Sequence, residues 1–574
     1  MCVNNWAKGP SSRFPRDERR PIFPQGNILN QSPQIASVPG LQPLPETAEL
    51  YAREGWWDGR SLVDLLTAGF ERYDKTVFRI HSETRPYSGT VGEVATLARR
   101  LANSLLDGPL QAGDVIAFQL PNWMEAAVAV WGCTLAGLTT VPIPHFYGPH
   151  ELRFILNQSR ARVFITADRF GKRDYVEELD GIRRDLQVLE QIIVVGENVP
   201  TWARAFESLI THEALYKAAK PRPESIAILG YTSGTNAQAK GVRLTHRGLV
   251  FETCTHMSRA MEKGFPVLMG SPVTHVTGLL VSLLLPMHFG DPIHLIDVWN
   301  PDRVLPAMLE NALSAGNGAP FFFASVLDHP QFSSRHAANM SAIAVGGSPV
   351  PPLLIERADR LGIMAWRVYG CTEHATIVGG KRSDSLQQRA FTDGKPLPGV
   401  EVRIVDADGR MCSPGQPGEI RTRGPDLCAG YVDESLNGTF DAHGWFSTGD
   451  IGVLDEQGYL TITDRLKDVI IRGGENISAT EIEAMLARVD GIAEVAVVAM
   501  PDAKYGERAC AFVRVKAGNV ALDLQRIRTQ LENFGLAKIK WPEALEIVND
   551  FPRTPSGKIK KYMLRERLRA RPQD

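Results

Sequence analysis

This 574-residue sequence lacks paired cysteines and lacks an excess of either charge. Its seven cysteines are scattered, with no spacing typical of a zinc site or a disulfide framework, which favours a reducing cytoplasm. Lysine plus arginine (63) nearly equals aspartate plus glutamate (65), so no global field points to nucleic acid or to an acidic membrane. Charges and prolines interrupt the first residues, so we expect no secretory signal peptide.

Several sequence signals of other protein classes are absent as well. No G-x-S-x-G occurs, which disfavours a hydrolase, and no G-x-G-x-x-G occurs, which disfavours a dehydrogenase. One uncharged run, residues 126–144, approaches the length of a membrane span, but it contains glycines and threonines and ends in a strand-like piece. We therefore expect a buried helix that leads into a buried strand, and no transmembrane segment.

The length predicts more than one domain. Residues 1–47 are rich in Pro, Asn, Gln and Arg and lack periodicity, which predicts an extended N-terminal arm, either disordered or laid over the body of the protein. Beyond this arm, helical patterns alternate with short apolar runs, which predicts βαβ units and parallel sheets. The clearest predicted helices are 61–70 and 91–106, and the clearest predicted strands are 115–120, 161–166 and 191–195.

Residues 225–248 are the stretch with the strongest chemical signal. An apolar run at 226–229 predicts a buried strand, and small or hydroxylated residues follow it as far as Gln238. Backbone N–H groups, hydroxyls and the ammonium of Lys240 could together surround a triphosphate. A solvated turn between strands is the alternative. A P-loop is excluded, because Lys240 is preceded by Ala239 and followed by Gly241.

This loop resembles the Y-T-S-G-T-T-G-x-P-K-G signature of adenylate-forming enzymes, the superfamily that includes acyl-CoA synthetases, aryl-CoA ligases, luciferases and peptide-synthetase adenylation domains. The match covers residues 231–235 and 240–241, and the sequence departs from the signature at Asn236, Ala237 and Ala239. Further motifs of the family follow in order. They are a small-residue turn at 341–349, a Y-G-x-T-E motif at 369–373, matches at 444–450 and 464–468, and a final P-x-x-P-S-G-K motif at 552–558.

The resemblance implies an α/β fold with two domains after the arm. Residues 48–466 would form a large AMP-binding domain of βαβ subdomains plus a small β-barrel-like part. Residues 467–574 would form a mobile α+β cap domain that hinges at Lys467. Within this cap, Ser478 and Glu481 form the pattern of a helix start.

The resemblance also implies which residues bind ATP, Mg²⁺ and coenzyme A. The ATP/AMP-binding residues would be Thr232, Ser233, Gly234, Thr235, Lys240, Gly346, Gly347, Ser348, Tyr369, Gly370, Thr372, Asp450, Arg465 and Lys558. In this set Tyr369 would stack on adenine, and Asp450 would accept hydrogen bonds from the ribose hydroxyls. Mg²⁺ would be held by Glu373 and Thr232. Coenzyme A would run along Gly473 and Gly474, although a glycine turn before a capped helix explains these two residues equally well.

The catalytic residues implied in the same way are Lys558, Glu373, Thr235 and His275. In acyl- and aryl-activating members a histidine at the place of His275 flanks the acyl pocket, whereas a satisfied core histidine is the alternative. No aspartate stands in register to hold an amine, which favours an acid without an α-amino group. Residues 318–327 would line an apolar acyl tunnel or belong to an ordinary core. Cys371 stands at a variable position with no suitably placed base, which disfavours a thiol nucleophile.

The function implied by the resemblance is a cytoplasmic, ATP-dependent acyl-CoA ligase. It would activate a fatty, alicyclic or related carboxylic acid as acyl-AMP and transfer it to coenzyme A, with no nucleic-acid partner and with a homodimer as the oligomeric expectation. Two alternatives stay open. One is a fatty acyl-AMP ligase that delivers the acyl group to a carrier protein, and the other is a non-catalytic nucleotide-binding homologue.

Overall fold

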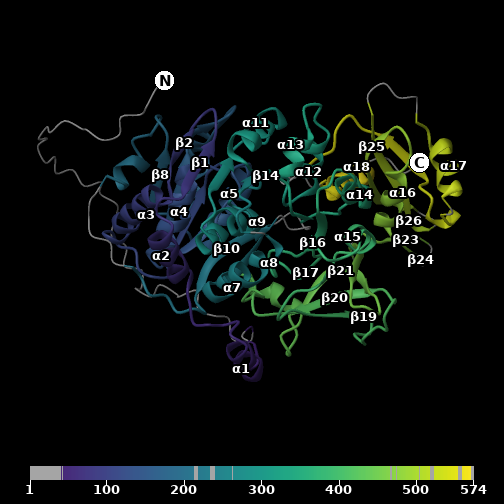
Figure 1. The fold of residues 1–574 in the computed structure, drawn as a ribbon, viewed down its shortest axis with the longest axis horizontal. Helices are drawn as coiled ribbons and strands as arrows, with labels where there is room; N and C mark the ends of the chain where they lie inside the picture. The colour runs from purple at the N-terminus through teal and green to yellow at the C-terminus, as the bar shows by residue number, and fades with distance from the viewer. Residues whose placement is uncertain are drawn as a thin grey trace, which may run out of the picture. The chain divides into compact units, whose positions relative to one another are not determined.

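The computed structural model describes residues 41, 43–211, 218–232, 239–261, 263–465, 468–472, 475–502, 505–516, 522–534, 536–553 and 559–570. Figure 1 shows the chain from its N-terminal helices in purple to its C-terminal helices in yellow. Helices and strands alternate along most of it, as the sequence predicts, and the fold is α/β with mixed sheets.

The largest sheet has seven strands in the order β11-β10-β4-β3-β5-β8-β9. All neighbouring pairs are parallel except β10 and β11. This pattern confirms the predicted βαβ units, because helix α4 (Met124–Leu135) connects β3 to β4 and helix α5 (Pro149–Ser159) connects β4 to β5. The strands are β3 (Val115–Gln119), β4 (Thr139–Pro142), β5 (Val163–Ala167), β8 (Gln191–Val195), β9 (Arg204–Ala205), β10 (Ile226–Thr232) and β11 (Lys240–Thr245).

The uncharged run at 126–144 is a buried helix followed by a buried strand, as predicted. Helix α4 (Met124–Leu135) is buried along its whole length from its second residue onward, and strand β4 is fully buried. Helices α2 (Leu62–Arg72) and α3 (Val91–Leu106) start with capping boxes at Ser61 and Thr90 and join α4 in the main hydrophobic core. In the part of the chain that the structure describes, no helix combines the length and the apolar character needed to cross a bilayer.

Besides the small hairpin of β6 (Arg169–Phe170) and β7 (Arg173–Asp174), three further sheets belong to the described part of the large domain. One is mostly parallel, with the order β14-β12-β13-β1-β2, and one carries the predicted turn at 341–349, with the order β15-β16-β17-β18. The third is the antiparallel β19-β20-β21-β22 sheet. The strands are β1 (Val77–His81), β2 (Tyr87–Thr90), β12 (Val267–Met269), β13 (Ile293–Ile296), β14 (Ser314–Ala315), β15 (Ile343–Gly346), β16 (Ala365–Tyr369), β17 (Val378–Gly379), β18 (Lys395–Pro396), β19 (Glu401–Val405), β20 (Gly418–Arg423), β21 (Phe446–Leu454) and β22 (Leu460–Arg465).

The C-terminal part is an α+β unit with its own core. Ser478 Oγ accepts a hydrogen bond from Glu481 N at 3.0 Å, which confirms the predicted helix start. Its two apolar clusters contain only residues from Ile470 onward. The elements are β23 (Ile470–Arg472), β24 (Glu475–Ile477), α16 (Ala479–Leu486), β25 (Ile492–Asp502), β26 (Gly506–Val515), α17 (Leu524–Asn533), β27 (Ala544–Ile547) and α18 (Lys561–Arg569).

One expectation about the N-terminal arm needs correction. Helix α1 (Pro45–Arg53) begins inside the segment predicted to be extended, with Pro45 at its first position and Tyr51 buried. A proline at the first helical position is compatible with a helix, because the missing N–H would have no partner there. Residues 1–40 lie outside the described residues, and the domain limits 47 and 467 stay predictions.

Candidate active site

The predicted phosphate loop is the connection of the β10–β11 hairpin. Thr232, at the end of β10, pairs in register with Lys240, at the start of β11. The two residues therefore face each other across the mouth of the loop, where a hydroxyl and an ammonium could contact the same anion. The loop residues Ser233, Gly234 and Thr235 lie outside the described residues.

The Y-G-x-T-E turn packs against this hairpin. A Cβ on Gly230 would lie 3.0 Å from Thr372 Cγ2, so the missing side chain lets Thr372 approach β10. A Cβ on Gly370 would lie 1.9 Å from Ala375 O, so the turn requires glycine for its close backbone approach. The predicted site residue Thr372 thus lies beside the strand that leads into the phosphate loop, about 140 positions earlier in the chain.

Glu373 lies beside the same hairpin through a residue that the motifs do not predict. Tyr431 Oη donates to Glu373 Oε1 at 2.7 Å. Lys240 Nζ lies 5.5 Å from the centre of the Tyr431 ring, within the range of a cation–π contact. A carboxylate oxygen is a hard ligand of the kind that Mg²⁺ prefers, so Glu373 fits the implied metal role.

A buried polar network lies on the other side of the Glu373 turn. His374 Nε2 lies 3.2 Å from Asp426 Oδ1, and Thr376 Oγ1 donates to Glu252 Oε1 at 2.5 Å. His256 Nδ1 donates to Glu252 Oε2 at 2.7 Å, and its other ring nitrogen donates to the carbonyl of Pro398 at 2.9 Å. The residues that follow Glu373 are therefore fixed by side-chain hydrogen bonds to the protein interior.

The charges in this network are set by burial and by the neighbouring carboxylates. Burial opposes the charge of His256, but Glu252 and Asp426 outweigh it and raise the pKa of His256 to about 9. The imidazole is therefore protonated at neutral pH and balances the carboxylates around it. Burial and then the charge of Glu373 hold the pKa of Cys371 well above its usual range, so a thiolate does not form there. This agrees with the prediction that Cys371 is not a nucleophile.

The predicted adenine turn follows β15 and lies beside Tyr369. Gly346 pairs with Val368 across the parallel β15–β16 ladder, and a Cβ on Gly346 would lie 2.4 Å from Val368 O. Gly347 has a φ of +78°, a left-handed conformation that favours glycine. The glycine at 346 is thus required by strand packing and the glycine at 347 by backbone conformation, and Ser348 follows them directly.

The predicted adenine and ribose residues are in direct contact. Tyr369 Oη donates to Asp450 Oδ2 at 2.7 Å, although the residues are 81 positions apart in the chain. Burial and then the charge of Asp450 raise the pKa of Tyr369 well above its usual range, so the phenol remains a donor. The backbone of Arg465 pairs with Asp450 across β21 and β22. Three predicted nucleotide contacts therefore come together at this place.

His275 lies at the N-terminal end of a short helix, α9 (Val276–Leu279). The loop before it is fixed by Asn122, whose Oδ1 accepts from Val273 N at 2.9 Å and whose Nδ2 donates to Ser271 O at 3.2 Å. The His275 ring lies 6.0 Å from the ring of Phe146, with the planes tilted by 31°. An aromatic side chain from the loop after β4 thus flanks the histidine that the resemblance places at the acyl pocket.

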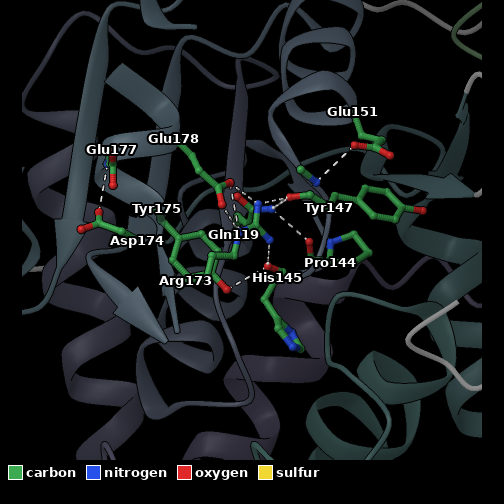
Figure 2. Close-up of polar contacts among 11 residues, drawn as sticks. Gln119, Pro144, His145, Tyr147, Glu151, Arg173, Asp174, Tyr175, Glu177 and Glu178 are labelled. Carbon is green, nitrogen blue, oxygen red and sulfur yellow. Dashed lines mark hydrogen bonds and ion pairs between the residues drawn. The ribbon is translucent and has the colours of Figure 1, made fainter. Parts of the chain in front are cut away.

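The loop that carries Phe146 is held by its backbone carbonyl groups (Figure 2). Arg173 donates to the carbonyl oxygens of His145 and Tyr147, and Tyr175 Oη donates to His145 O at 2.8 Å. Gln119 Nε2 adds hydrogen bonds to the carbonyls of Pro144 at 3.1 Å and Tyr147 at 2.8 Å. Burial, followed by the charges of Arg173 and His275, lowers the pKa of His145 to about 4, so its imidazole is neutral.

The apolar segment at 318–327 contains helix α12 (Pro320–Leu327). Phe323 and Val326 are fully buried in a core cluster of the large domain, and Phe322 packs edge-on against Trp299 with ring centres 4.9 Å apart. Phe321 is half exposed. These contacts account for the buried side chains of this helix as ordinary core residues.

Comparison with known proteins shows which family the chain resembles. Residues 69–432 match the AMP-binding enzyme family, and residues 481–558 match the AMP-binding enzyme C-terminal domain. The chain belongs to the AMP-binding enzyme family.

Relatives within the family cover almost the whole chain. A medium-chain fatty-acid–CoA ligase of Escherichia coli K12 is 32% identical over 531 residues, which span 91% of this chain and 93% of the relative. The 3-[(3aS,4S,7aS)-7a-methyl-1,5-dioxo-octahydro-1H-inden-4-yl]propanoyl:CoA ligase of Rhodococcus jostii RHA1 is 31% identical over 82% of this chain and 92% of its own. The crystal structure of ATP-bound MatB from Rhodopseudomonas palustris superposes with a TM-score of 0.78 at 26% identity, covering 88% and 99% of the two chains.

Several of the family's motif residues lie outside the described residues or are described only by their backbone. Lys467, Gly473, Gly474 and Lys558 are outside, and only the backbone of Arg465 is described. Strands β23 and β24 flank the two glycines, and a bridge between Arg553 and Ile559 flanks the lysine loop. Their assigned roles stay predictions.

The motifs miss three residues that the structure adds to the site, Tyr431, Asn122 and Arg173. Each contacts a residue far away in the sequence. Tyr431 lies 58 positions from its partner Glu373, Asn122 lies 151 positions from Val273, and Arg173 lies 28 positions from His145. A single sequence carries no signal for such pairs, because their side chains meet only after the strands have paired.

Proposed function

We propose that this chain is an AMP-forming acyl-CoA ligase that activates an apolar carboxylic acid with ATP and transfers it to coenzyme A. The observation that supports this most directly is the contact of Tyr431 with both Lys240 and Glu373. A cation suited to phosphate lies over the ring of this tyrosine, and a carboxylate suited to Mg²⁺ accepts from its hydroxyl. The identity to a medium-chain fatty-acid–CoA ligase over 531 residues agrees with this activity.

In the first step, a carboxylate oxygen of the acid attacks the α-phosphorus of ATP, and the bond to the bridging oxygen of pyrophosphate breaks. Negative charge builds on the phosphoryl oxygens, so the enzyme must supply cations and hydrogen-bond donors. In our proposal Lys240, Thr232 and Thr372 supply them from the large domain, and Lys558 from the cap. Glu373 would hold Mg²⁺, which would supply positive charge to offset that of the phosphates.

Nucleotide binding in this proposal uses the contacts around Tyr369. The ring of Tyr369 offers a face for adenine, and the carboxylate of Asp450 accepts from the ribose hydroxyls. The hydrogen bond between these two side chains orients both before ATP arrives. Preorganisation of this kind lowers the entropy lost on binding.

In the second step, the thiol of coenzyme A attacks the acyl carbon and AMP leaves. We assign Gly473 and Gly474 to the pantetheine path and Lys467 to the hinge that turns the cap between steps. A cap of this kind needs a separate hydrophobic core, and the C-terminal clusters of the described residues have one. The cap limits of 467–574 belong to this proposal.

The acid is proposed to be fatty or alicyclic, without an α-amino group. The His275 ring and the Phe146 ring lie against each other, and buried leucines such as Leu279 and Leu283 follow His275 along the chain. Two of the relatives carry names that refer to a medium-chain fatty acid and to a methyl-dioxo-octahydroindenyl propanoate. Both acids combine one carboxylate with an apolar body.

The test is a screen of medium-chain, long-chain and bicyclic acids with purified protein, ATP and Mg²⁺. A ligase releases pyrophosphate only when its acid is present and then consumes the coenzyme A thiol. Pyrophosphate release without thiol consumption would favour acyl-AMP delivery to a carrier protein, and no release with any acid would favour a nucleotide-binding homologue. The cytoplasmic location and the homodimer are parts of the same proposal, tested by cell fractionation and by light scattering.

A further inference from the structure

Tyr431 contacts two groups of the proposed ATP site at once. Its hydroxyl donates to Glu373 Oε1 at 2.7 Å, and its ring lies 5.5 Å from Lys240 Nζ. The residue is only 2% exposed, so both contacts are made from a fixed position in the core. The hydrogen bond occupies one carboxylate oxygen of Glu373, and the second oxygen accepts no hydrogen bond from the side chains seen in the described part of the chain.

The backbone around Tyr431 is tied to the same two elements. Val432 N donates to Gly241 O at 2.8 Å, which attaches the segment to β11 beside Lys240. Cys428 N donates to Glu373 O at 2.8 Å, which attaches it to the Glu373 turn. Tyr431 pairs with Val242, and Lys240 lies two residues away on the same face of β11. The phosphate hairpin and the Glu373 turn are thus joined through this short segment.

The hydroxyl of Tyr431 can only act as a donor toward Glu373. An ionised carboxylate has only acceptor sites, so the phenol must be the donor in this 2.7 Å contact. A protonated phenol at this distance restricts rotation of the carboxylate, which a mobile water molecule would not do.

We propose that Tyr431 is a positioning residue that orients the Glu373 carboxylate for Mg²⁺ and holds the Lys240 ammonium next to it. This inference rests on the proposed function, in which Glu373 binds the metal. Residues that hydrogen-bond to a metal ligand typically change metal affinity or activity by about 10–100-fold when they are replaced. We therefore expect a metal-binding defect when the hydroxyl is removed.

The first variant is Tyr431→Phe, which removes the hydroxyl and keeps the ring for Lys240. Mn²⁺ serves as the probe, titrated by electron paramagnetic resonance in the presence of a non-hydrolysable ATP analogue. We expect Mn²⁺ to bind about 10–100-fold more weakly, with metal-free affinity for the analogue unchanged. Tyr431→Leu also removes the ring, and it should in addition weaken metal-free analogue binding by about 2–5-fold, the equivalent of an exposed cation–π contact.

Tyr459→Phe is the matched control. Tyr459 Oη donates to Asp384 Oδ1 at 2.9 Å in a buried setting outside the proposed site, so this variant loses the same kind of hydrogen bond. Circular dichroism and melting temperature should be alike for the two phenylalanine variants. We expect Tyr459→Phe to bind Mn²⁺ like the parent.

A double variant separates positioning from a general loss of structure. Once Glu373→Gln has removed the ligand, adding Tyr431→Phe should weaken Mn²⁺ binding no further. Parental Mn²⁺ affinity in Tyr431→Phe, or a further loss in the double variant, would overturn the positioning role. Parental affinity in Glu373→Gln would instead refute the metal role of Glu373, and the acid screen tests the ligase activity separately.

Discussion

Arg173 provides a test of how the acid-binding region is built, because it holds a loop and is not expected to touch substrate. Its guanidinium donates to the carbonyl oxygens of His145 and Tyr147, which flank Phe146 (Figure 2). Phe146 in turn lies against His275. Replacement of Arg173 by methionine keeps much of the side-chain volume and removes both contacts, together with the ion pair to Glu178, so the loop and its phenylalanine should lose their fixed position.

The magnitude follows from the hydrogen bonds that remain. Each hydrogen bond from a charged donor contributes about 1.5–3 kcal/mol, so the loss of both sets an upper limit of about 3–6 kcal/mol on the free energy that the variant loses. Gln119 and Tyr175 still donate to the same loop in the variant. We therefore expect a loss below that limit, about 2 kcal/mol in transition-state stabilisation, which is about 30-fold in kcat/KM for the acid.

The assay is pyrophosphate release, with the acid and ATP varied separately. In Arg173→Met the KM for the acid should rise. The KM for ATP should stay within about twofold of the parent, a change that corresponds to less than about 0.5 kcal/mol of binding free energy. The matched control is Arg169→Met on the same small hairpin, where Arg169 pairs with Asp174 and is 66% exposed. Such an exposed ion pair contributes little to the stability of the fold, so its loss should leave the loop in place. An equal loss for acid and ATP, or an equal defect in the control, would refute the reasoning.

The remaining predictions concern the cap, the acyl side and the buried network. Lys558→Ala should cost acyl-AMP formation about 2.7–4 kcal/mol of transition-state stabilisation and leave thioester formation from supplied acyl-AMP largely unchanged. Lys467→Pro should have the opposite effect. Rapid-quench assays of each half-reaction measure both rates, and equal losses in the two steps would contradict this division. Asn122→Ala should raise the KM for the acid more than that for ATP, because it frees the loop before His275; equal changes would contradict this. The raised pKa of His256, about 9 against an ordinary 6.5, means that its charge stabilises the fold fully below pH 6.5 and is lost as pH rises toward 9. The melting temperature should therefore fall across that window, and less so in His256→Gln.

Much of the fold could be predicted, because its signals are local. Alternating helices and apolar strands predict a parallel sheet, and strands β3, β5 and β8 lie within about two residues of their predicted bounds. The Ser478 cap is a pattern within four residues, and the structure confirms it. Helix α1 was missed, because a stretch that is rich in proline and surrounded by polar residues has little periodicity to read.

Residues of the candidate site could be predicted from the sequence only where they belong to a recognised motif. Tyr369 and Asp450 each belong to a motif and could be named from the sequence, whereas the hydrogen bond between them is seen only in the structure. Tyr431 has no such motif in the prediction, and its role depends on the pairing of its segment with β11. The ion pair of Glu252 with His256 is also invisible in sequence, because charged residues four apart on a helix usually lie on a solvated face.

The burial of that ion pair has a functional consequence for the Glu373 turn. Thr376 donates to Glu252 and His374 contacts Asp426, so two residues of the turn are tied to a charged network that water does not reach. A buried carboxylate that loses its partner is left uncompensated, which is strongly destabilising. The turn therefore cannot shift without disrupting the network. We infer that Glu373 keeps its place in the proposed reaction and that the conformational change proposed between its two steps falls to the cap, whose described residues have a hydrophobic core of their own.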